Sequence, residues 1–151
     1  MSATASTIVA AAATAIGAGL STWSRSPRPS PDSWPLDGQG IQHHQWSIAA
    51  ERTEIVSGWR PTASGVPGEK VAQARTELRV RWAANLRPDA PHTDYTAALA
   101  DLDDLFVALS GSSLTGIGQI IPQDVVYTPI ADRWLLTSAS FTCTHTLTLR
   151  S

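Results

Sequence analysis

The sequence contains very little cysteine or lysine and few charged residues of either sign. Cys143 is the only cysteine among 151 residues, which excludes an intrachain disulfide and a cysteine cluster able to hold zinc. Only 16% of the residues are charged and the formal net charge is -2, so overall charge gives no reason to expect a nucleic acid or an acidic membrane as partner. Stability must therefore come from packing or from contacts with other chains.

A signal peptide and a membrane-spanning helix are not expected either. The apolar run from Ile8 to Leu20 consists mostly of Ala, Thr and Gly, and no Lys or Arg precedes Arg25. A signal peptide has a basic segment before its apolar run, and a spanning helix needs about 20 apolar residues. We therefore predict a soluble helix from Ala5 to Trp23 and no membrane partner.

The apolar content, 42%, is that of a globular protein, and the length suits one domain over residues 1–151. Alternating apolar and polar residues predict strands, and a stripe of period 3.6 predicts a second helix that starts at Thr93 and is capped by Gly111. The order of elements predicts an α+β fold, mainly an antiparallel sheet with two helices packed on one face. The predicted strands are Ile41–Glu51, Thr76–Leu86, Ile117–Ile130 and Trp134–Arg150, and the helix is Thr93–Leu109.

Two segments are predicted to lack regular structure. Residues 24–40 hold four prolines and are interpreted as an extended, Pro-rich connector. Residues 52–74 are rich in glycine and proline, and loops of this length are usually functional or disordered, so we predict a mobile hairpin arm between the first two strands. Pro122 and Pro129 cannot donate to a strand ladder, which predicts an edge position for the strand that contains them.

The candidates for chemistry are few. His43 and His44 are adjacent on a predicted strand and would point to opposite faces, so they are not expected to bind one metal ion. His145 is predicted to be a hydrogen-bonded core histidine, with an inter-subunit contact as the alternative. Cys143 lies two residues from His145 on one strand, with nothing evident to orient a base. We predict no enzyme, no metal and no cofactor.

Candidate interface residues are more numerous. Arg75, Arg79, Arg81 and Arg87 share the non-core side of one strand, where they could form an ordinary wet face, pair with carboxylates across an interface or contact phosphates. Asp101, Asp103 and Asp104 are expected on the solvated side of the second helix, where Asp101 and Asp104 could meet arginines of a neighbouring subunit. Trp34 and Trp59 fall in predicted loops, and tryptophan is enriched where interfaces bind most strongly. We predict that Trp34, Trp59, Arg79, Arg81, Asp101 and Asp104 contact partner chains.

The layout also resembles a known family. The helix from Ala5 to Trp23, the strand ending in Arg87, the helix from Thr93 to Leu109 and the closing strand from Phe141 to Arg150 together resemble the tail-terminator proteins of long-tailed bacteriophages. The resemblance covers most of the chain. It implies a structural virion protein, assembled in the host cytoplasm, that forms a homohexameric ring on the tail tube. The implied partners are other copies of the chain, the tail-tube protein and a neck or head-closure protein, with DNA only as cargo passing through the lumen.

Two other classes of function remain open. The first is a different structural role in the same particle, as a head-closure or neck connector or another tail subunit. The second is a small nucleic-acid or ligand-binding module. A nucleic-acid binder would lose affinity steeply with salt, and when Arg79 and Arg81 are neutralised.

Overall fold

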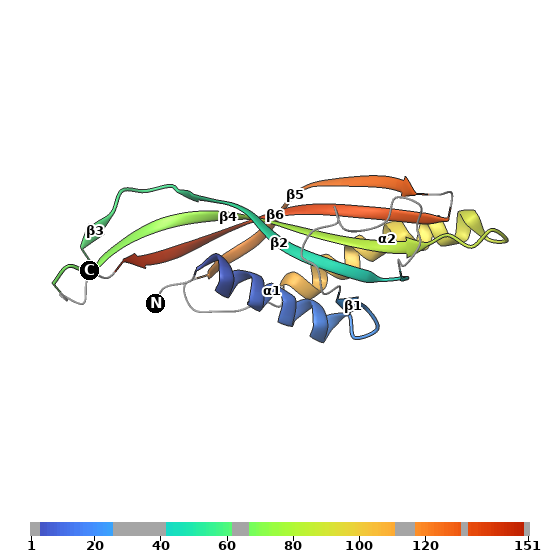
Figure 1. Cartoon of the computed structure of the whole chain (residues 1–151), viewed down its shortest axis with the longest axis horizontal. Helices are drawn as coiled ribbons and strands as arrows, with labels where there is room; N and C mark the ends of the chain where they lie inside the picture. Colours follow the sequence, from blue (N-terminus) through green and yellow to red (C-terminus); the bar gives the residue numbers. More distant parts are fainter. Residues whose placement is uncertain (1–3, 26–41, 62–66, 111–116, 131–132, 150–151) are drawn as a thin grey trace.

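The fold is seen in a computed structural model, which describes residues 4–25, 42–61, 67–110, 117–130 and 133–149. Within these residues, two helices accompany one sheet of six strands (Figure 1). In chain order the elements are α1 (Ala5–Gly19), β1 (Ser24–Arg25), β2 (Gln45–Ile55), β3 (Arg60–Pro61), β4 (Lys70–Asn85), α2 (Pro91–Ser110), β5 (Ile117–Ile130) and β6 (Trp134–Leu149).

The sheet has the strand order β1-β2-β4-β6-β5, and β3 pairs with β4 outside this path. The pairing of β1 with β2 is parallel, and the other described pairings are antiparallel. The predicted α+β class with a mainly antiparallel sheet is therefore confirmed.

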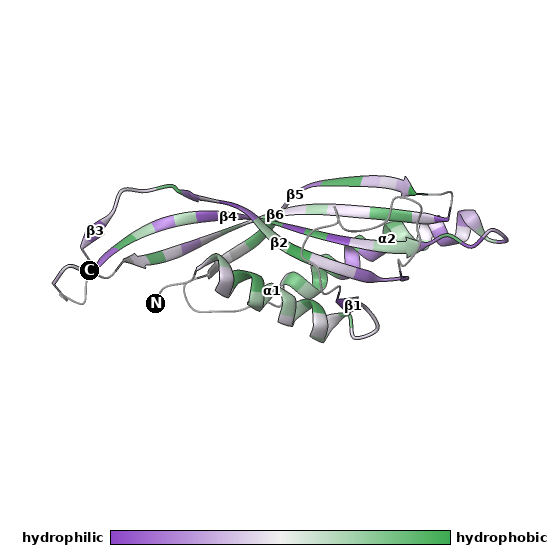
Figure 2. Cartoon of the chain, viewed as in Figure 1, coloured by the Kyte–Doolittle hydropathy of each residue, from purple (hydrophilic) through white to green (hydrophobic). Residues whose placement is uncertain are grey.

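The hydrophobic core contains side chains from both helices and from one face of the sheet. In β4 and β6 the cross-strand partners Leu78 and Phe141 are both buried, and Ile8, Ile16 and Leu105 of the helices join the same cluster. Fully burying a side chain of this size contributes about 1.5–3 kcal/mol. Figure 2 shows hydrophilic and hydrophobic residues mixed along the strands, as expected for a sheet that has one wet face.

Helix α1 is four residues shorter than predicted. Its first turn is capped by Thr4, whose hydroxyl accepts a hydrogen bond of 3.3 Å from the backbone N–H of Thr7. The helix ends at Gly19, and a turn separates it from Trp23, which is buried in the core from outside the helix. Trp23 therefore continued the apolar pattern without continuing the helix.

The predicted connector 24–40 begins with regular structure, which corrects that prediction. Ser24 and Arg25 form β1, and the N–H of Ser24 donates to the carbonyl of His44 at 3.1 Å. The rest of this segment lies outside the described residues. The next strand runs over 45–55 and not 41–51, because His44 has a φ of 58°, in the left-handed region that a strand cannot contain.

Both ends of the predicted loop 52–74 belong to strands. Residues 52–55 are the end of β2 and residues 70–74 are the start of β4, where Arg52 pairs with Glu77 and Ile55 with Ala74 across the ladder. This part of β2 is largely exposed, so it lacks the apolar alternation that would have marked it as a strand. Figure 1 shows that the end of the sheet near β3 extends beyond both helices.

The second helix starts two residues earlier than predicted. Pro91 is its first residue, a position where the missing N–H of proline costs nothing, so Thr93 lies in the first turn and is not the cap. Asp94 accepts hydrogen bonds from the backbone N–H of Arg87 at 2.7 Å and from its guanidinium Nε at 2.9 Å. These bonds from Arg87 hold the pKa of the Asp94 carboxyl below its usual value. The predicted cap Gly111 lies outside the described residues.

The last two strands agree closely with the sequence. The strand β5 has the predicted bounds and lies at one edge of the sheet, as its prolines Pro122 and Pro129 indicated. The strand β6 pairs with β4 along its whole length, and its buried residues alternate with partly exposed threonines and serines. This long ladder forms the centre of the molecule.

Candidate assembly surfaces

The arginines of β4 make ion pairs within the chain. Arg79 donates from Nε to Glu51 Oε1 at 2.7 Å and from Nη1 to Ser138 Oγ at 2.9 Å, and Arg81 Nη2 lies 3.8 Å from the same Glu51 oxygen. Further along the ladder, Arg75 Nη2 donates to Glu54 Oε2 at 3.1 Å.

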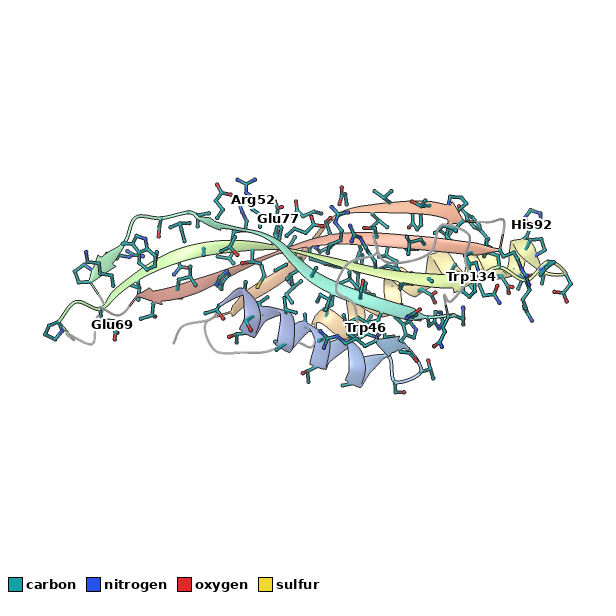
Figure 3. The ribbon with its side chains drawn as sticks, viewed as in Figure 1. Trp46, Arg52, Glu69, Glu77, His92 and Trp134 are labelled. Carbon is teal, nitrogen blue, oxygen red and sulfur yellow. The ribbon has the colours of Figure 1, made fainter. Side chains whose placement is uncertain are left out.

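This face of the sheet carries charges of both signs. Figure 3 shows Arg52 and Glu77 on the side of the sheet away from the helices, and Arg52 Nη2 lies 3.8 Å from Glu54 Oε2. The guanidinium charges are thus offset by the carboxylates of Glu51 and Glu54 in β2, which favours the wet-face interpretation over phosphate contact. The predicted partner contacts of Arg79 and Arg81 stay predictions.

Asp101 has a different environment from the one predicted. It is only 8% exposed, and its Oδ2 lies 2.9 Å from His44 Nε2. The expectation that this carboxylate lies on a solvated helix face is therefore wrong, because the residue turns inward and has a partner within its own chain. Reaching Asp101 from outside would require breaking that contact.

His43 and His44 also differ from prediction, because they lie in the turn before β2 and do not point to opposite faces. Their rings stack with centroids 3.7 Å apart, and His44 stacks on Trp23 at 4.8 Å. The backbone N–H of Asn85 donates to His43 Nδ1 at 3.0 Å. Burial, and then the neighbouring His44, lower the pKa of His43.

His43 and His44, called here the histidine corner, connect Trp23, which lies between α1 and β1, with the start of β2 and with Asp101 of α2. Its hydrogen bonds are made within the chain, and in the described part of the molecule no group of three or more His, Cys, Asp or Glu side chains could hold a metal ion. The arrangement can fix the turn at His44. The periodicity of the sequence did not predict the contact between His44 and Asp101, because these residues are 57 positions apart and only the turn conformation brings them together.

His145 and Cys143 lie in the core. His145 Nε2 is 2.7 Å from the hydroxyl of Thr76, which in turn lies 2.9 Å from the hydroxyl of Thr53, so the predicted hydrogen-bonded core histidine is confirmed. Burial raises the pKa of the Cys143 thiol to about 11. The thiol is therefore protonated at neutral pH and is a poor nucleophile.

Large apolar side chains are exposed at both edges of the sheet. At one edge, Ile55, Val56 and Trp59 lie in residues 55–61, called here the β3 tip, and Trp59 is 42% exposed. At the other edge, β5 exposes Ile121, Val126 and Tyr127. Trp59 thus has the exposure that its predicted role requires, whereas Trp34 lies outside the described residues.

A third apolar surface lies where the two helices meet. An open groove of about 660 Å³ lies between the end of α1 and α2. Its volume is within the range of about 300–1,000 Å³ that is typical of ligand pockets. Its floor is narrow because Gly19 packs directly on Ala108. Asp104 lies at the groove, and Val107 is 73% exposed there. The lining residues are Ala15, Ala18, Gly19, Leu20, Asp104, Val107 and Ala108.

The exposed apolar residues of β5 and of the groove were not identified from the sequence. Only Val107 could have been identified in this way, because it is an apolar residue on the same side of α2 as the exposed Asp103 and Asp104. Among the described residues, no helix is both long and apolar enough to span a membrane. No protein-family model matches the chain, and a search of curated proteins gives no significant match.

Proposed function

We propose that this chain is a structural subunit of a long-tailed bacteriophage, a tail terminator that forms a ring on the tail tube. The observation that carries the proposal is the presence of unlike apolar surfaces at opposite edges of one sheet, the β3 tip and β5. Large exposed apolar side chains, when grouped, mark sites of contact between proteins. Tryptophan is prominent among the residues that dominate such contacts, which suits Trp59.

The positions of these surfaces suit a ring. In a ring, one patch of each copy meets a different patch of the next copy, and the rotation closes after a fixed number of copies. A subunit that also sits on a tube needs a further surface for the protein above or below it. The β3 tip, the α1/α2 groove and β5 are three such surfaces on separate parts of the chain. The α+β fold and the resemblance noted above fit this role.

In this proposal, the arm predicted between the first two strands contacts a neighbouring copy. The hairpin of β2 and β4, with β3 beside it, would carry the β3 tip away from the helices and toward a neighbouring copy. The helices would pack on the core face and leave the opposite, ion-paired face toward solvent or the lumen. Mixed charges on that face would let DNA pass without holding it.

The test is the size and shape of the assembled protein. Light scattering over a wide range of concentrations should give a closed oligomer, and six times the chain mass of 16.1 kDa is about 97 kDa. Electron microscopy of the same sample should show rings. A monomer at all concentrations, both alone and with the tail tube, would refute the proposal. A density map of the particle would separate a tail terminator from a head-closure or neck connector, the main alternative.

A further inference from the structure

The α1/α2 groove has the properties of a site for one bulky side chain and one cation. Its walls include the small side chains of Ala15 and Ala18 and the exposed Val107, which leave apolar surface uncovered. The carboxylate of Asp104 lies at the groove and is exposed. Among the described residues, no ion-pair partner of Asp104 lies within 4.0 Å, the limit for a salt bridge.

The β3 tip presents the complementary chemistry. Trp59 offers a large apolar ring with one N–H donor, and the next residue, Arg60, is exposed and has no carboxylate partner in the described part of the chain. Most of the other described arginines of β2 and β4 are paired with glutamates of the sheet. Within the described residues, the tip thus combines a guanidinium that has no carboxylate partner with an indole that is 42% exposed.

The tip and the groove are remote from each other in one chain. Figure 1 places β3 at one end of the elongated molecule, whereas the end of α1, next to β1, lies in the other half under the sheet. The central ladder of β4 and β6 holds the tip at that distance. Trp59 and Arg60 can therefore reach a groove only on another molecule.

We infer that the β3 tip of one copy docks into the α1/α2 groove of the next copy, with the Trp59 ring against Ala15, Ala18 and Val107 and the Arg60 guanidinium on Asp104. The occupant is a second copy of this chain, because the apolar ring and the cation of the tip match the apolar walls and the carboxylate of the groove. The contact joins unlike surfaces, so it repeats head to tail. The inference rests on the proposed ring and specifies how its subunits join.

Charge reversal in two separate variants tests this contact. Arg60→Asp leaves the groove intact and disables the tip, and Asp104→Arg does the reverse. Each variant should assemble at least about tenfold more weakly than the wild type, because like charges would meet across the contact. An equimolar mixture of the two variants should assemble again, because the two kinds of subunit can alternate. At one contact the new aspartate at position 60 meets the new arginine at position 104, and at the next contact the unchanged Arg60 meets the unchanged Asp104.

One control variant separates this effect from net charge, one further variant tests the tryptophan, and spectra and melting temperatures exclude misfolding. Asp103→Arg makes the same change of charge on α2 outside the groove and should assemble like the wild type. Trp59→Ala should weaken assembly by roughly 30-fold or more if the ring is a dominant anchor. Both positions of the swap are exposed, so the circular dichroism spectra and melting temperatures of the variants should match those of the wild type.

The outcomes distinguish the contact from the ring. Sedimentation velocity that shows wild-type oligomers, weakened single variants and a restored mixture supports the contact. If the wild type forms rings and both charge reversals form them equally well, the contact is wrong and the proposed ring stands. If the mixture does not recover although the single variants are folded and monomeric, the pairing of Arg60 with Asp104 is also wrong. A wild type that stays monomeric, both alone and with the tail tube, overturns both proposals.

Discussion

The close approach of the two helices at Gly19 leads to a sharp prediction about stability. A methyl group added at Gly19 would lie 2.8 Å from the Cβ of Ala108 and 3.3 Å from its Cα, which is closer than carbon atoms pack. Gly17, two residues earlier on the same helix, has nothing within 4 Å of the corresponding position. Alanine at these two positions should therefore have opposite effects.

The expected magnitudes follow from two opposing contributions. Alanine in a helix is favoured over glycine by roughly 0.5–1 kcal/mol, and Gly17→Ala should increase the free energy of unfolding by that amount. Gly19 is the last residue of α1, so this gain is smaller there, and overpacking costs about 1–3 kcal/mol. The net effect of Gly19→Ala is a destabilisation of about 0.5–2 kcal/mol, which lowers the melting temperature by a few degrees.

The assay is urea denaturation of the wild type, of the single variants Gly17→Ala, Gly19→Ala and Ala108→Gly, and of the double variant Gly19→Ala with Ala108→Gly. The double variant removes the methyl group that the new alanine would strike, so the two changes should couple favourably. If Gly19→Ala is as stabilising as Gly17→Ala, or if Ala108→Gly gives no coupling, the helices do not touch at this point. The groove proposed as a docking site would then lack its floor.

Three further changes test buried groups. Phe141→Ala should lower the free energy of unfolding by about 3–5 kcal/mol in urea, because the ring is fully buried. Asp101→Asn should lower it by roughly 1–3 kcal/mol, because the bond to His44 loses its charge, whereas the exposed Asp103→Asn should change it by less than about 0.5 kcal/mol. Between pH 9 and 11 the wild type should lose stability relative to Cys143→Ala. The reason is that the thiol has a pKa of about 11 in the folded chain and 9.0 in the unfolded chain, so only the unfolded chain releases the proton in this range. A difference between the two denaturation midpoints that does not change with pH would contradict this.

The predicted secondary structure was most accurate where one face of an element is buried. In β6 and in the second half of β4, apolar and polar residues alternate because one face meets the helices, and the predicted strands lie within the observed ones apart from Leu86 and residue 150. The prolines of β5 located an edge strand for a local reason, since they lack the N–H that a central strand must donate. Helix α2 was found from its stripe, with an error of two residues at its start.

The alternation of apolar and polar residues did not predict the elements that are stabilised by polar contacts. The end of β2 near the β3 tip is largely exposed, so its ladder with β4 and its cross-strand ion pairs, such as Arg75 with Glu54, are invisible to apolar periodicity. Asp101 was placed on the wet side of α2 because a carboxylate is usually there. Its burial depends on His44, whose left-handed backbone turns the ring toward the helix.

The sequence by itself determined the class of fold, the edge position of β5, the burial of His145 and the absence of an intrachain disulfide, because each depends on residue type and local spacing alone. The tertiary structure decided the rest. It paired Arg79 with Glu51 and Asp101 with His44, and it placed the β3 tip and the end of α1, where the groove lies, in different halves of the molecule. Such contacts join residues distant along the chain, and only the register of the strands and the packing of the helices specify which of them meet.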